Sequence, residues 1–222
     1  HTRSDGDWSS DVCSSDLKAQ FRNTVSIDEV LAAREVAWPL TLPMCSPIGD
    51  GAAAVVLVSE RKARELGMGR MVKVEAAQLS SGWDYADGEE GVAAGSARKL
   101  YESAGIGPSE LHCVELHDAS APSELMYYEY LGLCKPGEGG AFVEAGHSTL
   151  GGRVPVNTSG GLMRKGHPIG ATGIAQLVEL TEQLRGEAGD RQVAGAKVAL
   201  AENGGGFIGN DAAALALTLL SR

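Results

Sequence analysis

Apolar side chains recur along this chain in two rhythms, one typical of helices and one typical of strands. After Gly173 they return every three or four positions, which predicts a helix with one buried face. Its apolar residues are Ile174, Leu177, Val178, Leu180 and Leu184. Shorter apolar runs predict strands at 52–58, 71–79, 113–117, 154–157, 198–201 and 212–219.

Capping residues and glycines mark where other helices begin and end. Ser26 and Glu29 form a capping box, flanked by Val25 and Val30 as a staple, and begin a helix that must stop before Pro39. The pattern predicts three further helices: 59–66 closed by Gly67, 96–104 closed by Gly105 after a flexible approach at 91–95, and one from Pro122 to Leu131 before Gly132.

Strands interleaved with helices predict an α/β layered domain with a mixed sheet. The segment 67–69, Gly-Met-Gly, is the expected boundary between two parts of the chain.

Composition and charge narrow the class of protein. With 222 residues, 43% of them hydrophobic and 22% charged, the chain is long enough to bury a substantial core. A net charge of -10 and scattered Lys and Arg residues argue against nucleic acid as a partner. No apolar run of membrane-spanning length and no secretory segment is visible, so we expect neither a membrane partner nor export. Four cysteines without a C-x-x-C spacing argue against a disulfide framework and a zinc ribbon, and favour the cytoplasm.

The densest chemistry lies at 157–173, a glycine-rich loop that presents His167 and opens into the predicted helix. Glycines allow backbone N–H groups to approach a ligand. A helix N-terminus favours negative charge and keeps a nearby imidazole neutral, so His167 is placed to accept a proton. The alternative is a tight turn whose histidine only packs.

Other candidates have two readings each. Cys113, Glu115 and His117 share one face of a strand. They are either metal ligands or part of a buried strand whose last residue, His117, reaches a site. Arg164 and Lys165 contact an anionic ligand or are solvated loop charges. The aromatic cluster of Tyr127, Tyr128 and Tyr130 is helix packing or a binding platform. His112 and His147 have no supporting motif.

Three motifs in order, at 114–133, 154–173 and 198–210, closely resemble the C-terminal half of the thiolase superfamily. The His-Asp pair at 117–118 resembles the sterol-carrier-protein-x and archaeal branch. This resemblance implies a thiolase-like layered fold, with a mixed sheet covered by helices and one complete βαβαβαββ half.

The resemblance also implies roles for single residues in a Claisen reaction of acyl-CoA. His167 would activate a nucleophilic cysteine and help bind an oxyanion, and His117 would hold a catalytic water. The backbone N–H of Gly204 would contribute to the second oxyanion hole, and Gly160 and Gly161 would bring backbone against the substrate. Coenzyme A thioester is the substrate, with no bound cofactor and no metal.

Two positions depart from the family pattern. Many biosynthetic thiolases carry a cysteine where Glu202 stands, and the sterol-carrier branch carries one at Ala119. Glu202 either replaces the missing acid/base, with a pKa raised by burial, or is a hydrogen-bonded carboxylate at a strand end.

No segment resembles the loop that carries the thiolase nucleophile, and Cys45 lies in a segment that follows that loop in the family. We therefore expect a truncated chain. Residues 1–17 resemble a translated sequencing-adapter oligonucleotide, 18–69 a remnant of the thiolase N-terminal domain, and 70–222 the C-terminal domain.

The sequence thus predicts part of a thiolase-like acyl-CoA acyltransferase that is inactive alone, from a parent that forms a homodimer or homotetramer. Two alternatives stay open. One is a sterol-carrier-type aldolase acting on CoA-linked side chains. The other is a non-catalytic scaffold that binds acyl-CoA or a small acyl-CoA-delivering partner protein.

Overall fold

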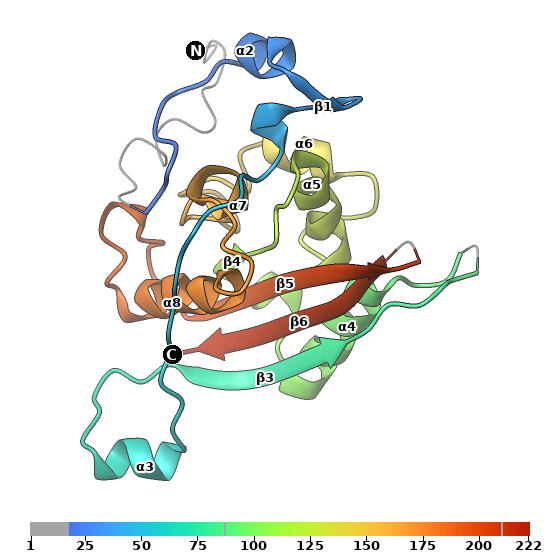
Figure 1. Ribbon diagram of the computed structural model, residues 1–222. Helices are drawn as coiled ribbons and strands as arrows, with labels where there is room; N and C mark the ends of the chain where they lie inside the picture. Colours follow the sequence, from blue (N-terminus) through green and yellow to red (C-terminus); the bar gives the residue numbers. More distant parts are fainter. Residues whose placement is uncertain (1–17, 87, 210) are drawn as a thin grey trace.

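A four-stranded mixed sheet forms the centre of the computed structural model, which describes residues 18–86, 88–209 and 211–222 (Figure 1). The predicted artefactual tail at 1–17 lies outside the described residues. The strands are β3 (Lys73–Ser80), β4 (Cys113–Glu115), β5 (Val198–Ile208) and β6 (Asp211–Ser221), in the spatial order β3-β6-β5-β4. β6 is antiparallel to both of its neighbours, whereas β4 is parallel to β5. The predicted α/β class with a mixed sheet is confirmed.

Alternate residues of the strands supply two cores, one on each face of the sheet. Leu200 and Leu217 join the larger core, which receives side chains from α4 (Val92–Ala104) and α5 (Ala121–Tyr130). Ala199 and Leu220 join the smaller core with α8 (Thr172–Arg185). Since a fully buried leucine contributes about 1.5–3 kcal/mol, helices on both faces hold the sheet in place.

The five predicted helices are present, including the one predicted from Pro122 to Leu131, which is α5, and the caps expected from Ser26, Ser59 and Gly105 are confirmed. The capping box of Ser26 and Glu29 begins α2 (Ile27–Ala32), with Ser26 N–H donating to Glu29 Oε2 at 2.8 Å. The Ser59 side chain caps α3 (Glu60–Glu65). Helices α4 and α8 end at glycines in the left-handed region, Gly105 (φ 67°) and Gly186 (φ 74°).

The flexible approach predicted at 91–95 is wrong, because α4 already begins at Val92. Val92 and Ala93 are buried, and the Asp211 carboxylate of β6 accepts a hydrogen bond from Val92 N–H at 3.0 Å. This long-range cap supplies a helix start that local sequence does not show.

The strand predicted at 52–58 is also wrong. The segment has no strand partner among the described residues, and Val56 and Leu57 are 86% and 77% exposed. An apolar run becomes a strand only where a neighbouring strand accepts its backbone hydrogen bonds.

The strand predicted at 154–157 is reduced to one parallel bridge between Val114 and Val156. Asn157 then turns into the left-handed region (φ 52°), and its side-chain Oδ1 accepts the Leu116 N–H at 2.9 Å in place of a backbone carbonyl. The expected βαβαβαββ order therefore lacks its third strand as a regular element.

Short elements were not predicted, because they fall below the window in which periodicity can be read. They are β1 (Glu35–Ala37), β2 (Leu40–Thr41), η1 (Leu42–Met44), η2 (Pro108–Glu110), α6 (Gly139–Glu144), α7 (Gly161–Lys165) and η3 (Gly189–Arg191). Of these, α7 matters most for the site, since it lies inside the glycine-rich loop.

Candidate active site

A cavity of ≈ 840 Å³ opens beyond the carboxyl end of β4. One wall comes from α5, another from the start of α4, and a third from the glycine-rich end of the β5–β6 hairpin. His117, which follows β4, and His167, which precedes α8, both line it. The fold therefore brings two of the three predicted catalytic residues to one cavity.

The two imidazoles lie edge to face. His117 Nε2 is 3.4 Å from His167 Nε2, and the ring centroids are 4.9 Å apart with an interplanar angle of 78°. The rings come from segments 50 residues apart in the sequence, so their contact depends on tertiary packing.

We assign the proton of His167 to Nδ1 from the contacts of Thr172. Thr172 Oγ1 lies 2.8 Å from His167 Nδ1 and 3.2 Å from the Pro168 carbonyl oxygen, to which the hydroxyl can donate. With this assignment His167 Nε2 presents a lone pair, and His117 Nε2 is the donor of the contact between the two rings.

Burial keeps both histidines neutral. It lowers the pKa of His117 to about 4, with a further contribution from the charge that His167 would carry. Burial also lowers the pKa of His167. A neutral imidazole is the form that accepts a proton at ordinary pH, as expected for His167.

Glu202 lies beneath this pair rather than facing the cavity. Its side chain is fully buried, and Oε2 accepts the His117 N–H at 2.8 Å. Burial raises its pKa to about 7, although the His117 N–H and the nearby Tyr127 hydroxyl act in the opposite direction. In this structure Glu202 matches the hydrogen-bonded carboxylate of the two sequence interpretations, with Oε2 on the His117 backbone, and the acid/base role stays a prediction.

The backbone of three consecutive glycines, Gly204 to Gly206, also lines the cavity, and the oxyanion-hole role of Gly204 stays a prediction. Gly204 pairs in register with Leu215 of β6. The predicted cluster of three tyrosines includes both core and cavity residues. Tyr128 is core, whereas Tyr127 and Tyr130 line the cavity.

No cysteine among the described residues lines the cavity. Cys113 is buried in the smaller core, and burial raises the pKa of its thiol. Cys45 and Cys134 are half-buried elsewhere. The part of the chain that the structure describes thus offers a base and a donor without a thiol beside them.

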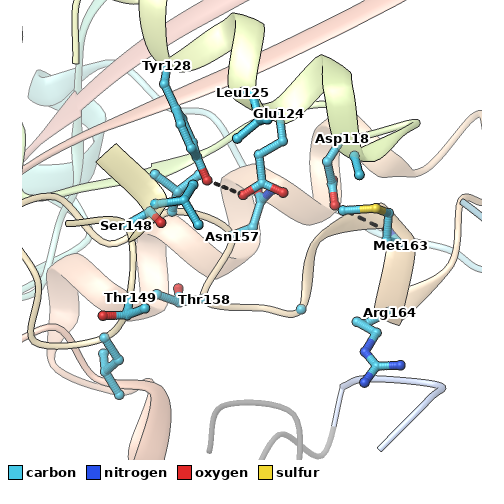
Figure 2. A pocket seen from close by; sticks show the side chains of 15 residues that line it. Asp118, Glu124, Leu125, Tyr128, Ser148, Thr149, Asn157, Thr158, Met163 and Arg164 are labelled. Carbon is cyan, nitrogen blue, oxygen red and sulfur yellow. Dashed lines mark hydrogen bonds between the residues drawn. The ribbon is translucent and has the colours of Figure 1, made fainter. Parts of the chain in front are cut away.

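The four residues expected to bind substrate lie at or next to α7, and two of them, Gly160 and Arg164, line a second, smaller cavity (Figure 2). This cavity of ≈ 350 Å³ is bordered by Gly160, Met163 and Arg164. The Arg164 guanidinium donates to the Asn23 carbonyl at 2.8 Å. Lys165 turns inward to Ser159 and Glu115, which corrects the expectation of a loop charge open to a ligand or to water.

Cys113, Glu115 and His117 do not converge, because Cys113 enters the smaller core while Glu115 meets Ser159. Among the residues that the structure describes, no group of three metal-ligating side chains is placed to hold an ion. Within the same ranges, no helix is long and apolar enough to cross a membrane.

Sequence reasoning missed the structural roles of two residues near the site, Thr172 and Asp118. Thr172 has a local signal, since it lies one helical turn after the Gly-His-Pro turn. Asp118, whose carboxylate accepts the Leu162 N–H at 2.7 Å, has none, since its partner lies 44 residues away.

Comparison with known proteins places these residues in a family context. The model of a family described as thiolase C-terminal domain-like matches residues 74–218. Sterol carrier protein 2 of Rattus norvegicus is 45% identical over 194 residues, which cover 83% of this chain and 36% of that protein. Acetyl-CoA acetyltransferase of Methanothermobacter thermautotrophicus is 41% identical over 204 residues, covering 90% of this chain and 53% of that protein.

A thiolase subunit and a solved aldolase structure are also similar to this chain. Benzoylsuccinyl-CoA thiolase subunit BbsB of Thauera aromatica is 42% identical over 180 residues, covering 79% of this chain and 46% of that subunit. A solved structure of an Ltp2-ChsH2(DUF35) aldolase superposes with a TM-score of 0.79 at 22% identity, over 97% of this chain and 56% of that chain. The chain spans about a third to a half of the length of these curated relatives.

Proposed function

The chain belongs to the thiolase C-terminal domain-like family of the thiolase superfamily, and on this premise we propose that it carries the histidine half of an acyl-CoA acyltransferase site. The proposed reaction is Claisen condensation, or the reverse thiolytic cleavage, of a 3-oxoacyl-CoA. The substrate is a coenzyme A thioester, with no bound cofactor and no metal. We expect the parent enzyme to be a cytoplasmic homodimer or homotetramer.

One observation carries the proposal. His117 Nε2 and His167 Nε2 lie 3.4 Å apart, both rings line one cavity, and burial lowers both pKa values. A base beside a hydrogen-bond donor is what acyl transfer requires, since a proton leaves the nucleophile while negative charge develops on the carbonyl oxygen.

The proposed reaction begins with transfer of an acyl group to a cysteine. His167 Nε2 accepts the proton of a cysteine thiol, which the described residues do not supply, and the thiolate attacks the thioester carbonyl. The resulting oxyanion accepts hydrogen bonds from His117 Nε2–H and from backbone N–H groups such as that of Gly204. When the bond to the coenzyme A sulfur breaks, the departing thiolate takes the proton back from His167. The regenerated Nε2 then removes the α-proton of a second thioester, the enolate carbon attacks the acyl-cysteine, and the released cysteine thiolate takes this proton from His167.

The proposal is testable without that thiol, because enolisation of a thioester needs only a base and an oxyanion donor. Deuterium uptake at the α-carbon of acetyl-CoA in D₂O is measured by NMR for the wild type, for His167→Gln, and for His147→Gln as a control. His147 packs against Phe142, outside the cavity.

We expect His167→Gln to slow α-exchange by about 10²- to 10⁴-fold, the usual contribution of a general base, while His147→Gln exchanges at the wild-type rate. Exchange that is equal in all three proteins would contradict the assignment of His167 as the base. For thiolysis of acetoacetyl-CoA, we expect no turnover by this chain, because no described cysteine faces the cavity.

A second candidate is aldol cleavage, favoured by the same absence of a described thiol from the cavity. In a retro-aldol step the base removes the β-hydroxyl proton, the Cα–Cβ bond breaks, and the donor stabilises the thioester enolate until it is protonated. The structural neighbour described as an aldolase supports this candidate, and its two-protein description is consistent with a small partner protein.

The two activities differ in their need for free coenzyme A. A 3-hydroxyacyl-CoA cleaved to a carbonyl compound without consuming coenzyme A would favour the aldolase. A third candidate, the non-catalytic acyl-CoA scaffold, would bind the thioester by calorimetry and leave its α-protons unexchanged.

A further inference from the structure

A buried polar cluster joins β4 to α7 and consists of Glu115, Ser159 and Lys165. Glu115 is 1% exposed and Ser159 is fully buried. Ser159 donates two hydrogen bonds to the Glu115 carboxylate. Its hydroxyl donates to Oε2 at 2.6 Å, and its backbone N–H donates to Oε1 at 3.1 Å. The carboxylate is therefore held in one orientation.

Lys165 completes the cluster from the end of α7. Its Nζ donates to Ser159 Oγ at 2.5 Å and lies 3.7 Å from Glu115 Oε2. Only 16% of the side chain is exposed, so the ammonium group points into the protein. Burial raises the pKa of Glu115, and the nearby Lys165 charge opposes this rise.

The opposite end of α7 is tied to the same stretch of chain. The Asp118 carboxylate accepts hydrogen bonds from Leu162 N–H at 2.7 Å and Met163 N–H at 3.3 Å (Figure 2). Glu115 and Asp118 flank His117 in the sequence, and Lys165 precedes His167 by two residues. Both ends of α7 are thus bound to the segment that carries His117.

We propose that Lys165 is a positioning residue, which fixes the distance between the His117 and His167 rings by anchoring the end of α7 to Glu115 and Ser159. The proposal rests on the proposed function only for its catalytic consequence, since the placement of the two rings is measurable by itself. It replaces the expectation that Lys165 contacts a phosphate of coenzyme A.

Lys165 is linked to His167 through a single residue, Gly166, which has a positive φ of 96° and donates its N–H to Leu162 O at 2.9 Å. A shift of the end of α7 is therefore passed to the His167 backbone, while the hydrogen bond from His167 N–H to the Pro47 carbonyl at 2.8 Å opposes it. A displacement of about 1 Å at a reacting group can cost about 10²-fold in rate.

The test compares Lys165→Met with the charge-balanced variant Lys165→Met/Glu115→Gln. The matched control is Lys73→Met, which removes a lysine 70% exposed and paired with Glu75 on β3. The readouts are the nuclear Overhauser effect between the His117 and His167 ring protons, the melting temperature, and kcat and KM for α-exchange of acetyl-CoA.

In Lys165→Met we expect the ring-to-ring signal to weaken about threefold or more, the result of about 1 Å of added separation, with kcat reduced and KM unchanged. The single variant also loses melting temperature, since it leaves a buried carboxylate without its cation. The double variant regains the melting temperature but not the ring-to-ring signal. Lys73→Met changes neither.

Three results would overturn the proposal. A full ring-to-ring signal in Lys165→Met with a lower melting temperature would make the cluster purely structural. A raised KM with an unchanged signal and kcat would assign Lys165 to the substrate. A double variant that regains the signal would show that charge balance, not the lysine anchor, places the rings. If α-exchange is absent from the wild type, the proposed function fails while the ring-to-ring signal still decides this inference.

Discussion

Thr172 is the contact from which we assign the proton of His167 to Nδ1, since its hydroxyl also lies 3.2 Å from the Pro168 carbonyl oxygen, to which it can donate. A histidine base in the wrong tautomer has its lone pair on the wrong side of the ring. In the serine-protease triad, loss of this control costs orders of magnitude in rate. The hydroxyl therefore contributes to chemistry without meeting a substrate.

Thr172→Val should reduce α-exchange of acetyl-CoA by about 10-fold or more, because the Nδ1–H loses its acceptor. The measurement is the exchange rate together with ¹⁵N chemical shifts of the His167 ring, which report the tautomer. Thr181→Val is the matched control, since Thr181 makes the same type of bond to Leu177 O in α8 at 2.7 Å and does not line the cavity. An unchanged tautomer in Thr172→Val would contradict the assignment.

Glu202 should make stability depend on pH. Its folded pKa is raised to about 7 from an ordinary 4.5. The contribution of this carboxyl group to the free energy of unfolding is thus fully present below about pH 4.5 and is lost as pH rises through about 7. The isosteric Glu202→Gln keeps an acceptor for His117 N–H and removes the titration.

The free energy of unfolding of Glu202→Gln relative to the wild type should therefore rise between about pH 5 and about pH 8, by at most about 3 kcal/mol. Urea unfolding at several pH values measures it. His117, with a pKa lowered to about 4, acts in the opposite direction over an overlapping pH range. Its contribution to the free energy of unfolding is lost as pH falls from about 6.5 through 4, in both proteins. Parallel curves for the two proteins would rule out a raised pKa for Glu202.

At the scale of elements, α7 is a helix of five residues that cannot be stable by itself. Gly161 begins it in the left-handed region (φ 57°), and a Cβ there would overlap the Asp118 carboxylate. Glycine is needed for both the backbone angle and the close approach.

Gly161→Ala should lower the free energy of unfolding by about 2 kcal/mol or more, from the strained backbone and the displaced carboxylate. Gly170→Ala, in the same loop with open space around its Cβ, should change it by less than about 0.5 kcal/mol. Thermal unfolding of both variants measures the difference. Equal effects would mean that Asp118 does not hold α7.

The sequence predicted the elements whose signals are local. The caps of α2 and α3, the glycine ends of α4 and α8, and the position of His167 before α8 are all visible in neighbouring residues. The errors share a cause, which is long-range hydrogen bonding. Asp211 starts α4 early, Asn157 ends a strand, and segment 52–58 has no described partner.

Local signals also explain which residues of the candidate site could be predicted. The motifs at 114–133 and 154–173 indicated His117 and His167, and the fold brings the two rings into contact. The inward turn of Lys165 and the burial of Glu202 depend on contacts with residues far away in the sequence, so spacing could not reveal them. The predicted domain division at 69–70 and the proposed roles of the site residues stay predictions.

At the scale of the whole molecule, the segment 52–58 leaves four consecutive aliphatic side chains in contact with solvent, Val55 to Val58. Exposed apolar surface of this kind promotes association between chains. The segment contributes little to the stability of the described fold, because it packs against little of it.

Val56→Ser/Leu57→Ser should leave the melting temperature within about 1 °C of the wild type and reduce self-association, seen by sedimentation velocity over a range of concentrations. A matched double substitution in the core, Leu217→Ser/Leu219→Ser, should unfold the protein, because both side chains are fully buried. A large loss of melting temperature in the first variant would show that the segment packs natively.

The order of the sheet has a consequence for how the chain acquires its structure during synthesis. β6, the last of the four sheet strands in chain order, lies between β3 and β5 and pairs with both. Until β6 is synthesised, β3 has no neighbour in this sheet, and β5 is paired only with β4. Folding of the sheet therefore waits for β6, and a nascent chain that lacks it presents two open strand edges to chaperones or to other chains.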